Sequence, residues 1–146
     1  MKKIINNRLY DTDTARLLGE WDNGLGLRDF DFLQEALYRK RTGEHFLYGH
    51  GGARTKYSEH AHGLWTDGEA ITPLTYEEAA SWAEEHLSAD EYIAVFGPVS
   101  EGEEDPSVPL NLYLPASLVA QLRREASQAD LSVSAYVVQR LTSPEA

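Results

Sequence analysis

The first half of the chain alternates apolar and polar positions in short runs that are separated by turn-forming residues. The pair Asn6-Asn7 lies between two such runs. Asparagine tolerates the positive φ angles that tight hairpin turns require, so a first hairpin is predicted there. Residues 41–44 contain Gly43 and lie between arms rich in aromatic side chains, which predicts a second hairpin. Together these patterns predict a meander of antiparallel strands.

Two segments of this half interrupt the alternation. Asp11 can cap a helix, and the apolar residues that follow as far as Leu18 predict a short helical segment. Residues 49–68 have few aliphatic side chains and many Gly, Ser, Thr and His residues, so we expect an ordered surface loop there. That loop carries the aromatic residues Tyr57 and Trp65.

The spacing of apolar positions becomes helical after the second hairpin. Thr75 and Glu78 form a capping box, in which a hydroxyl residue begins a helix and a carboxylate three positions later closes its first turn. Ser88 and Glu91 repeat this pattern, and the second helix is expected to end at Gly97. Apolar residues on one face of the first helix and acids on the other predict that it lies on the surface of the fold.

Residues 98–107 have almost no apolar side chains, which predicts an acidic linker between a body at 1–97 and a tail at 108–146. In the tail, strict alternation at 110–114 predicts a strand, and apolar positions at steps of three and four predict two helices after it. A segment of this size is too small to bury its own apolar surface, and one strand cannot pair with itself. The tail is therefore expected to be incomplete as a single copy.

Charge is distributed unevenly along the 146 residues, whose 13 Lys plus Arg and 24 Asp plus Glu give a formal net charge of -11. Residues 57–122 contain thirteen acids and neither Lys nor Arg. Such a field repels nucleic acid and attracts the basic grooves that normally hold it, although a solvated face has the same composition. Arg39-Lys40-Arg41 is the only basic cluster. It lies at a predicted hairpin tip, where a solvated turn or contact with nucleic acid or an acidic partner would both fit.

Composition excludes several classes of protein. A hydrophobic fraction of 42% predicts a folded, soluble chain with a real core, and no apolar run approaches the roughly 20 residues of a membrane span. The absence of cysteine excludes disulfides and thiolate chemistry and fits a cytoplasmic location. His60 and His62 lack a specified third ligand, and neither a serine elbow nor a phosphate loop is present. We therefore expect no metal, no cofactor and no enzymatic activity.

The tail resembles the ribbon-helix-helix family of bacterial repressors and antitoxins at residues 110–141, including the Leu-Pro end of the strand and the Leu-Ser start of the second helix. The resemblance implies that two copies pair their strands into an antiparallel ribbon and close a shared core. The residues implied to form the homodimer are Leu110, Leu112, Leu114, Leu118, Leu122, Val137 and Leu141. Together with the meander and helices that the residue pattern predicts for the body, the resemblance gives an expected α+β fold: an antiparallel β-meander with helices, followed by a C-terminal ribbon-helix-helix dimerisation module.

The same resemblance implies a DNA-binding surface on the side of the ribbon away from the core and at the start of the second helix. The residues at these positions are Asn111, Tyr113 and Ser132. DNA-binding members commonly carry Lys or Arg on the outward strand positions, and this tail does not. Because phosphate neutralisation supplies most non-specific DNA affinity, dimerisation alone and sequence-specific DNA binding both stay open.

The body resembles small acidic proteins of bacterial mobile elements and phages, a group that includes anti-CRISPR inhibitors. The similar segments are 3–6, 10–15, 37–40, 43–49 and 73–79. The resemblance implies a non-enzymatic protein of the host-cell cytoplasm that binds a CRISPR effector complex and blocks target capture or cleavage. It identifies no active site.

Carboxylates on the exposed faces of the two predicted helices offer a mechanism for such inhibition, because they can imitate phosphates in a basic channel. The candidate partner-binding carboxylates are Glu77, Glu78, Glu84, Glu85, Asp90 and Glu91. Tyr57 and Trp65 are candidate aromatic anchors, and Trp65 fits equally well in the core. The alternative function is a ribbon-helix-helix transcriptional regulator or antitoxin that binds operator DNA.

Overall fold

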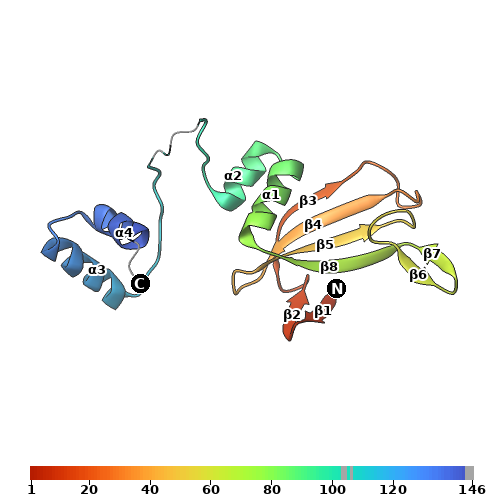
Figure 1. The fold of residues 1–146 in the computed structure, drawn as a ribbon, viewed down its shortest axis with the longest axis horizontal. Helices are drawn as coiled ribbons and strands as arrows, with labels where there is room; N and C mark the ends of the chain where they lie inside the picture. Colours follow the sequence, from red (N-terminus) through yellow and green to blue (C-terminus); the bar gives the residue numbers. More distant parts are fainter. Residues whose placement is uncertain (103–104, 106, 144–146) are drawn as a thin grey trace. The chain divides into compact units, whose positions relative to one another are not determined.

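The computed structural model describes residues 1–102, 105 and 107–143, and its contacts divide the chain into two compact units, Met1–Glu104 and Asp105–Ala146. The division falls within 98–107, the expected linker, of which 103, 104 and 106 lie outside the described residues. The strands are β1 (Lys2–Ile5), β2 (Arg8–Asp11), β3 (Arg16–Asp22), β4 (Leu33–Arg39), β5 (His45–Gly51), β6 (Glu59–Ala61), β7 (Leu64–Thr66) and β8 (Gly68–Leu74). The helices are α1 (Tyr76–His86), α2 (Ala89–Phe96), α3 (Ala116–Gln128) and α4 (Val133–Thr142). This is an α+β fold with antiparallel strands (Figure 1).

A four-stranded antiparallel sheet in the order β3-β4-β5-β8 forms the centre of the body (Figure 1). In the β4–β5 hairpin Leu37 pairs with Leu47, and Gly43 in the turn takes a φ of 93°. The separate β1–β2 hairpin turns at Asn6 and Asn7, whose φ angles are 51° and 64°. Both predicted hairpins are therefore confirmed, with the positive φ angles at the residues that best tolerate them.

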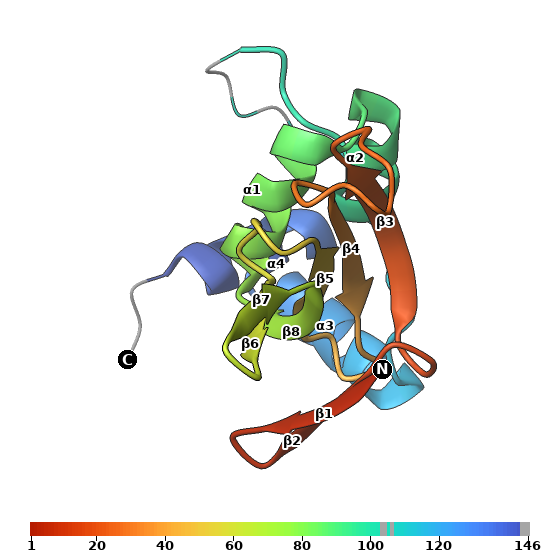
Figure 2. The same ribbon diagram turned by 90° about the vertical axis from the view of Figure 1, so that its right-hand side faces the viewer.

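Successive residues of the sheet strands point to opposite faces, and each face has its own core. On one face Leu37 belongs to a buried cluster with Trp82 of α1. On the other, Phe46 and Ile71 form a cluster with Tyr10, whose ring meets that of Phe46 edge-on at 5.5 Å. Tyr10 comes from β2, so the base of the β1–β2 hairpin belongs to this second core while its turn projects away from the sheet (Figure 2).

Both capping boxes are present, and both predicted helices follow them. The Thr75 N–H donates to Glu78 Oε1 at 2.9 Å, and the Glu78 N–H donates to Thr75 Oγ1 at 3.1 Å. Ser88 and Glu91 make the same two bonds at 3.1 and 3.2 Å. The second helix ends at Gly97, which has a φ of 95°. Two donors at each helix start are thereby satisfied without help from the sheet.

The tail contains the two predicted helices, which contact each other. Tyr136 Oη donates to Glu125 Oε2 across the pair at 2.7 Å, and Ser132 Oγ caps the second helix by accepting from the Ala135 N–H at 3.1 Å. The strand predicted at 110–114 is not formed, because this single chain offers it no partner strand in the described part of the tail. A ribbon-helix-helix module is therefore not confirmed.

The short helix predicted to follow Asp11 and reach Leu18 is wrong, because β3 begins at Arg16. The Asp11 carboxylate accepts from the Asp13 N–H at 2.9 Å, and its carbonyl accepts from the Ala15 N–H at 3.1 Å. These bonds close a single turn, after which the chain enters the sheet and packs Leu18 against the helix-side core. The hydrogen bonds that Asp11 accepts therefore stabilise a single turn and do not begin a helix.

The surface loop expected at 49–68 is wrong in part. The strand β5 continues to Gly51, and the later half of the segment folds into the β6–β7 hairpin. His62 and Gly63 form its turn with φ angles of 52° and 79°. The glycine and histidine content that indicated a loop therefore includes the two turn residues of a hairpin.

Candidate functional site

The outer side of α1 and α2 carries the candidate carboxylates. Ala79, Trp82 and Ala83 fix the rotation of α1 by pointing into the core, which leaves its acidic positions in solvent. All six predicted carboxylates are exposed, namely Glu77, Glu78, Glu84, Glu85, Asp90 and Glu91. The structure thus leaves all six acids exposed to solvent on two consecutive helices. We call these six side chains together the acidic helix face.

Two of these carboxylates also stabilise the helix starts, since Glu78 and Glu91 accept from the backbone in the capping boxes. Glu85 lies 4.0 Å from Nε2 of His86, which is an ion pair only when the imidazole is protonated. In the described part of the chain no Lys or Arg forms an ion pair with any of the six. The acidic helix face therefore keeps its negative charge available to a partner.

Trp65 lies on a second surface, at the other end of β8 from the start of α1 (Figure 1). Its side chain is 63% exposed, and that of the neighbouring Leu64 is 68% exposed. Across the β6–β7 hairpin Trp65 pairs with His60, and the two ring centroids are 4.9 Å apart. An exposed indole held on a short hairpin is a suitable anchor for a protein partner, because such rings bury much area at little entropic cost.

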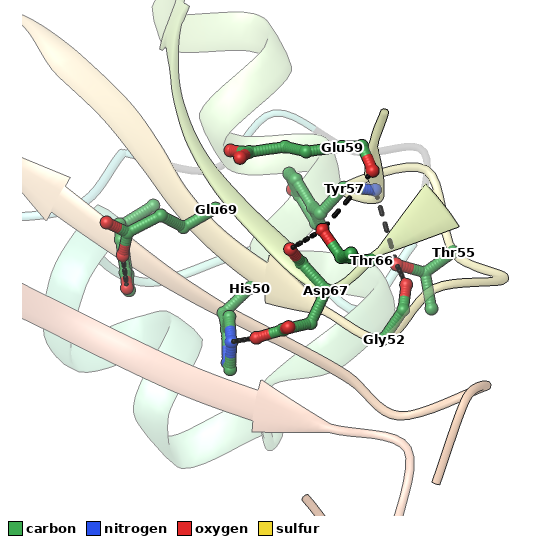
Figure 3. A network of polar contacts seen from close by, with 9 residues as sticks. His50, Gly52, Thr55, Tyr57, Glu59, Thr66, Asp67 and Glu69 are labelled. Atoms are coloured by element: carbon green, nitrogen blue, oxygen red, sulfur yellow. Dashed lines mark hydrogen bonds and ion pairs between the residues drawn. The ribbon is translucent and has the colours of Figure 1, made fainter. Parts of the chain in front are cut away.

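Polar contacts hold the base of this hairpin against the sheet (Figure 3). His50 Nε2 of β5 lies 3.6 Å from Asp67 Oδ2, directly before β8. Thr66 Oγ1 lies 3.3 Å from the carbonyl oxygen of Glu59 and 3.2 Å from that of Asp67. The Thr66 contacts join the two strands at the base of the hairpin, and the His50–Asp67 contact links that base to β5.

Tyr57 lies in the interior instead of on the surface, with only 7% of its side chain exposed. Its hydroxyl donates a hydrogen bond to Glu35 Oε2. Its ring lies so close to Gly49 that a Cβ there would be 1.8 Å from Tyr57 Cζ. Almost none of the Tyr57 ring is therefore accessible to a partner. This burial differs from the exposed position on a surface loop that was expected for Tyr57.

Glu35, which accepts the hydrogen bond from Tyr57, was not among the site residues predicted from the sequence. Glu35 is 2% exposed, and besides the Tyr57 hydroxyl it accepts from Trp82 Nε1 at 3.0 Å and pairs with Lys56 Nζ at 2.8 Å. Burial acts to raise the pKa of Glu35, but the hydrogen bonds from Lys56, Tyr57 and Trp82 outweigh burial and hold this pKa below its usual value. Strand alternation would have found it, because Glu35 falls on the same inward face as Leu37. The ionised carboxylate is fully paired, and its role is structural.

The tail exposes most of the residues predicted to form a dimer. Leu110 is 77% exposed, Leu112 is 64% exposed and Leu141 is 81% exposed. Leu114 and Leu118 are also exposed, whereas Leu122 and Val137 are half-buried. The three candidate DNA-binding residues, Asn111, Tyr113 and Ser132, are exposed as well. This much uncovered leucine is unusual for a complete domain and indicates a surface that requires a cover.

Among residues 1–102, 105 and 107–143, no group of three or more His, Asp or Glu side chains is arranged to hold a metal ion. Within those same residues no helix combines the length and the apolar composition that a membrane span requires.

Comparison with known proteins gave no relative, since no family model, no curated protein and no solved structure matches the chain.

Proposed function

We propose that this protein is a non-enzymatic inhibitor of the anti-CRISPR type, which binds a CRISPR effector complex through the acidic helix face and forms a homodimer through its tail. The observation that carries the proposal is the set of six exposed carboxylates on consecutive helices, none of them paired with Lys or Arg in the described structure. The resemblance of the body to small acidic phage proteins points to the same class of target.

The repeated position of the acids supports phosphate mimicry. Glu77 and Glu84 are seven residues, or two turns, apart on α1, so they lie on the same side of the helix about 10.5 Å apart along its axis. The capping boxes hold both helices in place before binding, so the carboxylates need little ordering when they enter a basic channel. Their combined field also raises the rate of encounter with such a channel.

Trp65 supplies a second contact in this proposal. It lies apart from the acidic helix face, so the two surfaces engage different parts of the effector complex. The carboxylates provide attraction and register, whereas burial of the exposed indole and of Leu64 provides apolar area. Trp65→Ala is therefore expected to raise the dissociation rate more than it lowers the association rate.

The proposed homodimer covers the leucines of the tail. Two copies of 110–114 would pair as antiparallel strands, which satisfies their backbone groups and turns Leu110 and Leu112 toward a shared core. Burial of each leucine contributes about 1.5–3 kcal/mol. Pairing of this kind would explain why apolar residues alternate along 110–114 although they are exposed in the single chain.

Charge reversal tests the inhibitor. The variant Glu84→Lys/Glu85→Lys should lose binding to purified CRISPR effector complexes and should no longer block cleavage of target DNA. The control Glu20→Lys/Glu101→Lys makes the same change of net charge at two exposed positions outside the acidic helix face. Phosphate mimicry is contradicted if both variants bind as the original chain does, or if both lose binding equally.

The alternative function, a ribbon-helix-helix regulator or antitoxin, has its own supporting observation. Asn111 and Tyr113 alternate with the tail leucines and are exposed, so a ribbon that buried Leu110 and Leu112 would present them together on its outer side. A gel shift with DNA from upstream of the protein's own gene separates the two functions. Salt-sensitive, sequence-specific retardation that Asn111→Ala abolishes would favour the regulator.

A further inference from the structure

An open groove of about 480 Å³ is lined by residues of the β1–β2 hairpin, of the turn after it and of the turn between β4 and β5. Arg8, Lys40 and Arg41 line it. A second hollow of about 360 Å³ shares Lys40 and Arg41 with the first and adds Arg16 and Arg39. Five basic side chains from three strands and one turn therefore lie along one connected surface, which we call the basic groove.

Most of this positive charge is not neutralised inside the protein. Glu44 is shared by two bases, with Arg8 Nη1 at 3.0 Å and Lys40 Nζ at 3.8 Å from its Oε2. Among the described residues no carboxylate forms an ion pair with Arg16, Arg39 or Arg41. The acids that flank the groove are thus outnumbered, and its outer part is open to an anion.

Two of the arginines are arranged at a cost to the fold. Arg16 and Arg39 are direct cross-strand partners in the β3–β4 ladder. Like charges at such positions destabilise a sheet, because their side chains lie side by side on one face. An anion between the two guanidinium groups would convert this repulsion into attraction, so the pair indicates a negatively charged ligand.

We propose that the basic groove binds the sugar–phosphate backbone of a nucleic acid strand, an activity separate from the proposed contact of the acidic helix face with an effector. Guanidinium groups match phosphate oxygens in bidentate geometry. The charges extend along two connected open hollows instead of converging on one enclosed pocket, which suits a row of phosphates better than a single small anion.

The lining of the groove also defines the kind of recognition. Its polar lining consists of charged groups and small hydroxyl residues such as Thr14, no aromatic side chain of the described residues lines either of its two hollows, and the Tyr10 ring is buried beneath Lys40 at 4.1 Å. Without an exposed ring on which a base can stack, binding is through phosphates and independent of base sequence. A second copy's acidic helix face is a poorer occupant, because groove and helices are different surfaces and their pairing would generate open chains.

Fluorescence anisotropy with the full-length chain tests this activity. The probes are a labelled single-stranded RNA and a labelled DNA duplex of the same length, which identify the preferred source of the phosphates. The variant Arg16→Gln/Arg41→Gln removes two exposed charges from the groove. Its affinity should fall at least tenfold at low salt, and its salt dependence should weaken by about 1.4–1.8 in log–log slope.

The control Arg28→Gln/Arg54→Gln makes the same charge change at exposed positions outside the groove and should keep its affinity within about twofold, the spread expected of a distant surface change. Circular dichroism checks that both variants are folded. The proposal is overturned by absence of binding to both probes at low salt, by equal losses in the two variants, or by displacement of the probes by polyglutamate as effectively as by unlabelled nucleic acid. The last result would identify an acidic protein as the ligand.

Discussion

The hydroxyl of Tyr57 donates a hydrogen bond to the buried carboxylate of Glu35, which lies 22 positions earlier in the chain. This bond ties the segment between β5 and β6 to the middle of β4. Lys56 and Trp82 also donate to this carboxylate. Glu35 of the sheet is therefore bonded both to the α1 helix, through Trp82, and to the segment between β5 and β6, through Lys56 and Tyr57. The stability predictions for Glu35 and Gly49 depend on this junction.

Glu35→Gln should lower the free energy of unfolding at pH 7 by about 1–3 kcal/mol, because it removes charged hydrogen bonds in the interior. The pKa of Glu35 is lowered in the folded state from its ordinary value of 4.5. Its stabilising contribution is therefore complete above that value and is lost as the pH falls through the folded-state pKa. Urea denaturation at pH 7 and at successively lower pH should show the difference between the original chain and the variant shrinking. A difference independent of pH would contradict this account.

Gly49→Ala should destabilise the body by about 1–3 kcal/mol, the usual cost of overpacking, because the added methyl group would collide with the Tyr57 ring. Gly26→Ala is the matched control, since a Cβ at Gly26 has no atom within 4 Å. Thermal unfolding of the two variants compares them directly. Equal melting temperatures would show that the Tyr57 ring can move aside.

Thr75→Ala should lower stability by about 1 kcal/mol, since it removes the hydroxyl that caps α1. Glu84→Gln, on the same helix, should leave stability within about 0.5 kcal/mol because its side chain is exposed. Effector binding should respond in the opposite way, with Glu84→Gln weakening it and Thr75→Ala changing it little. Urea denaturation together with binding kinetics separates the two roles, and parallel losses in both assays would contradict the division.

Leu112→Glu should convert the protein from dimer to monomer, because a carboxylate cannot enter the apolar core of the proposed ribbon. Asn111→Glu introduces the same group at the adjacent position, which faces outward in the proposed ribbon, and should stay dimeric. Light scattering at micromolar concentration measures both. A dimeric Leu112→Glu variant would place the dimer interface elsewhere.

Elements specified by neighbouring residues were predictable from the sequence. Asn6 and Asn7 specify one hairpin, and the boxes at Thr75 and Ser88 specify α1 and α2, because turn and cap chemistry acts within four residues. The exposure of the acidic helix face follows from the apolar spacing of α1 around Trp82.

The remaining features depend on partners far away in the chain. Leu18 lies in β3 instead of a helix because β3 pairs with β4 and Leu18 packs against the core cluster that includes Trp82 of α1. Tyr57 is buried because Glu35 and Gly49 provide a site for it, and neither is near in sequence. The basic groove likewise requires the β1–β2 hairpin to meet the β4–β5 turn, a meeting that no local pattern encodes. Each of these features is determined by contacts between residues that are distant in the sequence.

Both outer strands of the central sheet are interrupted. The β3 ladder shifts register between Leu17 and Gly19, and the notch at Gly19 is filled by Leu87. At the opposite edge β8 contains Pro73, which has no amide hydrogen. A regular edge is a template for intermolecular strand addition and fibril growth, and these interruptions make each edge a poorer template. We therefore expect the body to resist aggregation through its sheet.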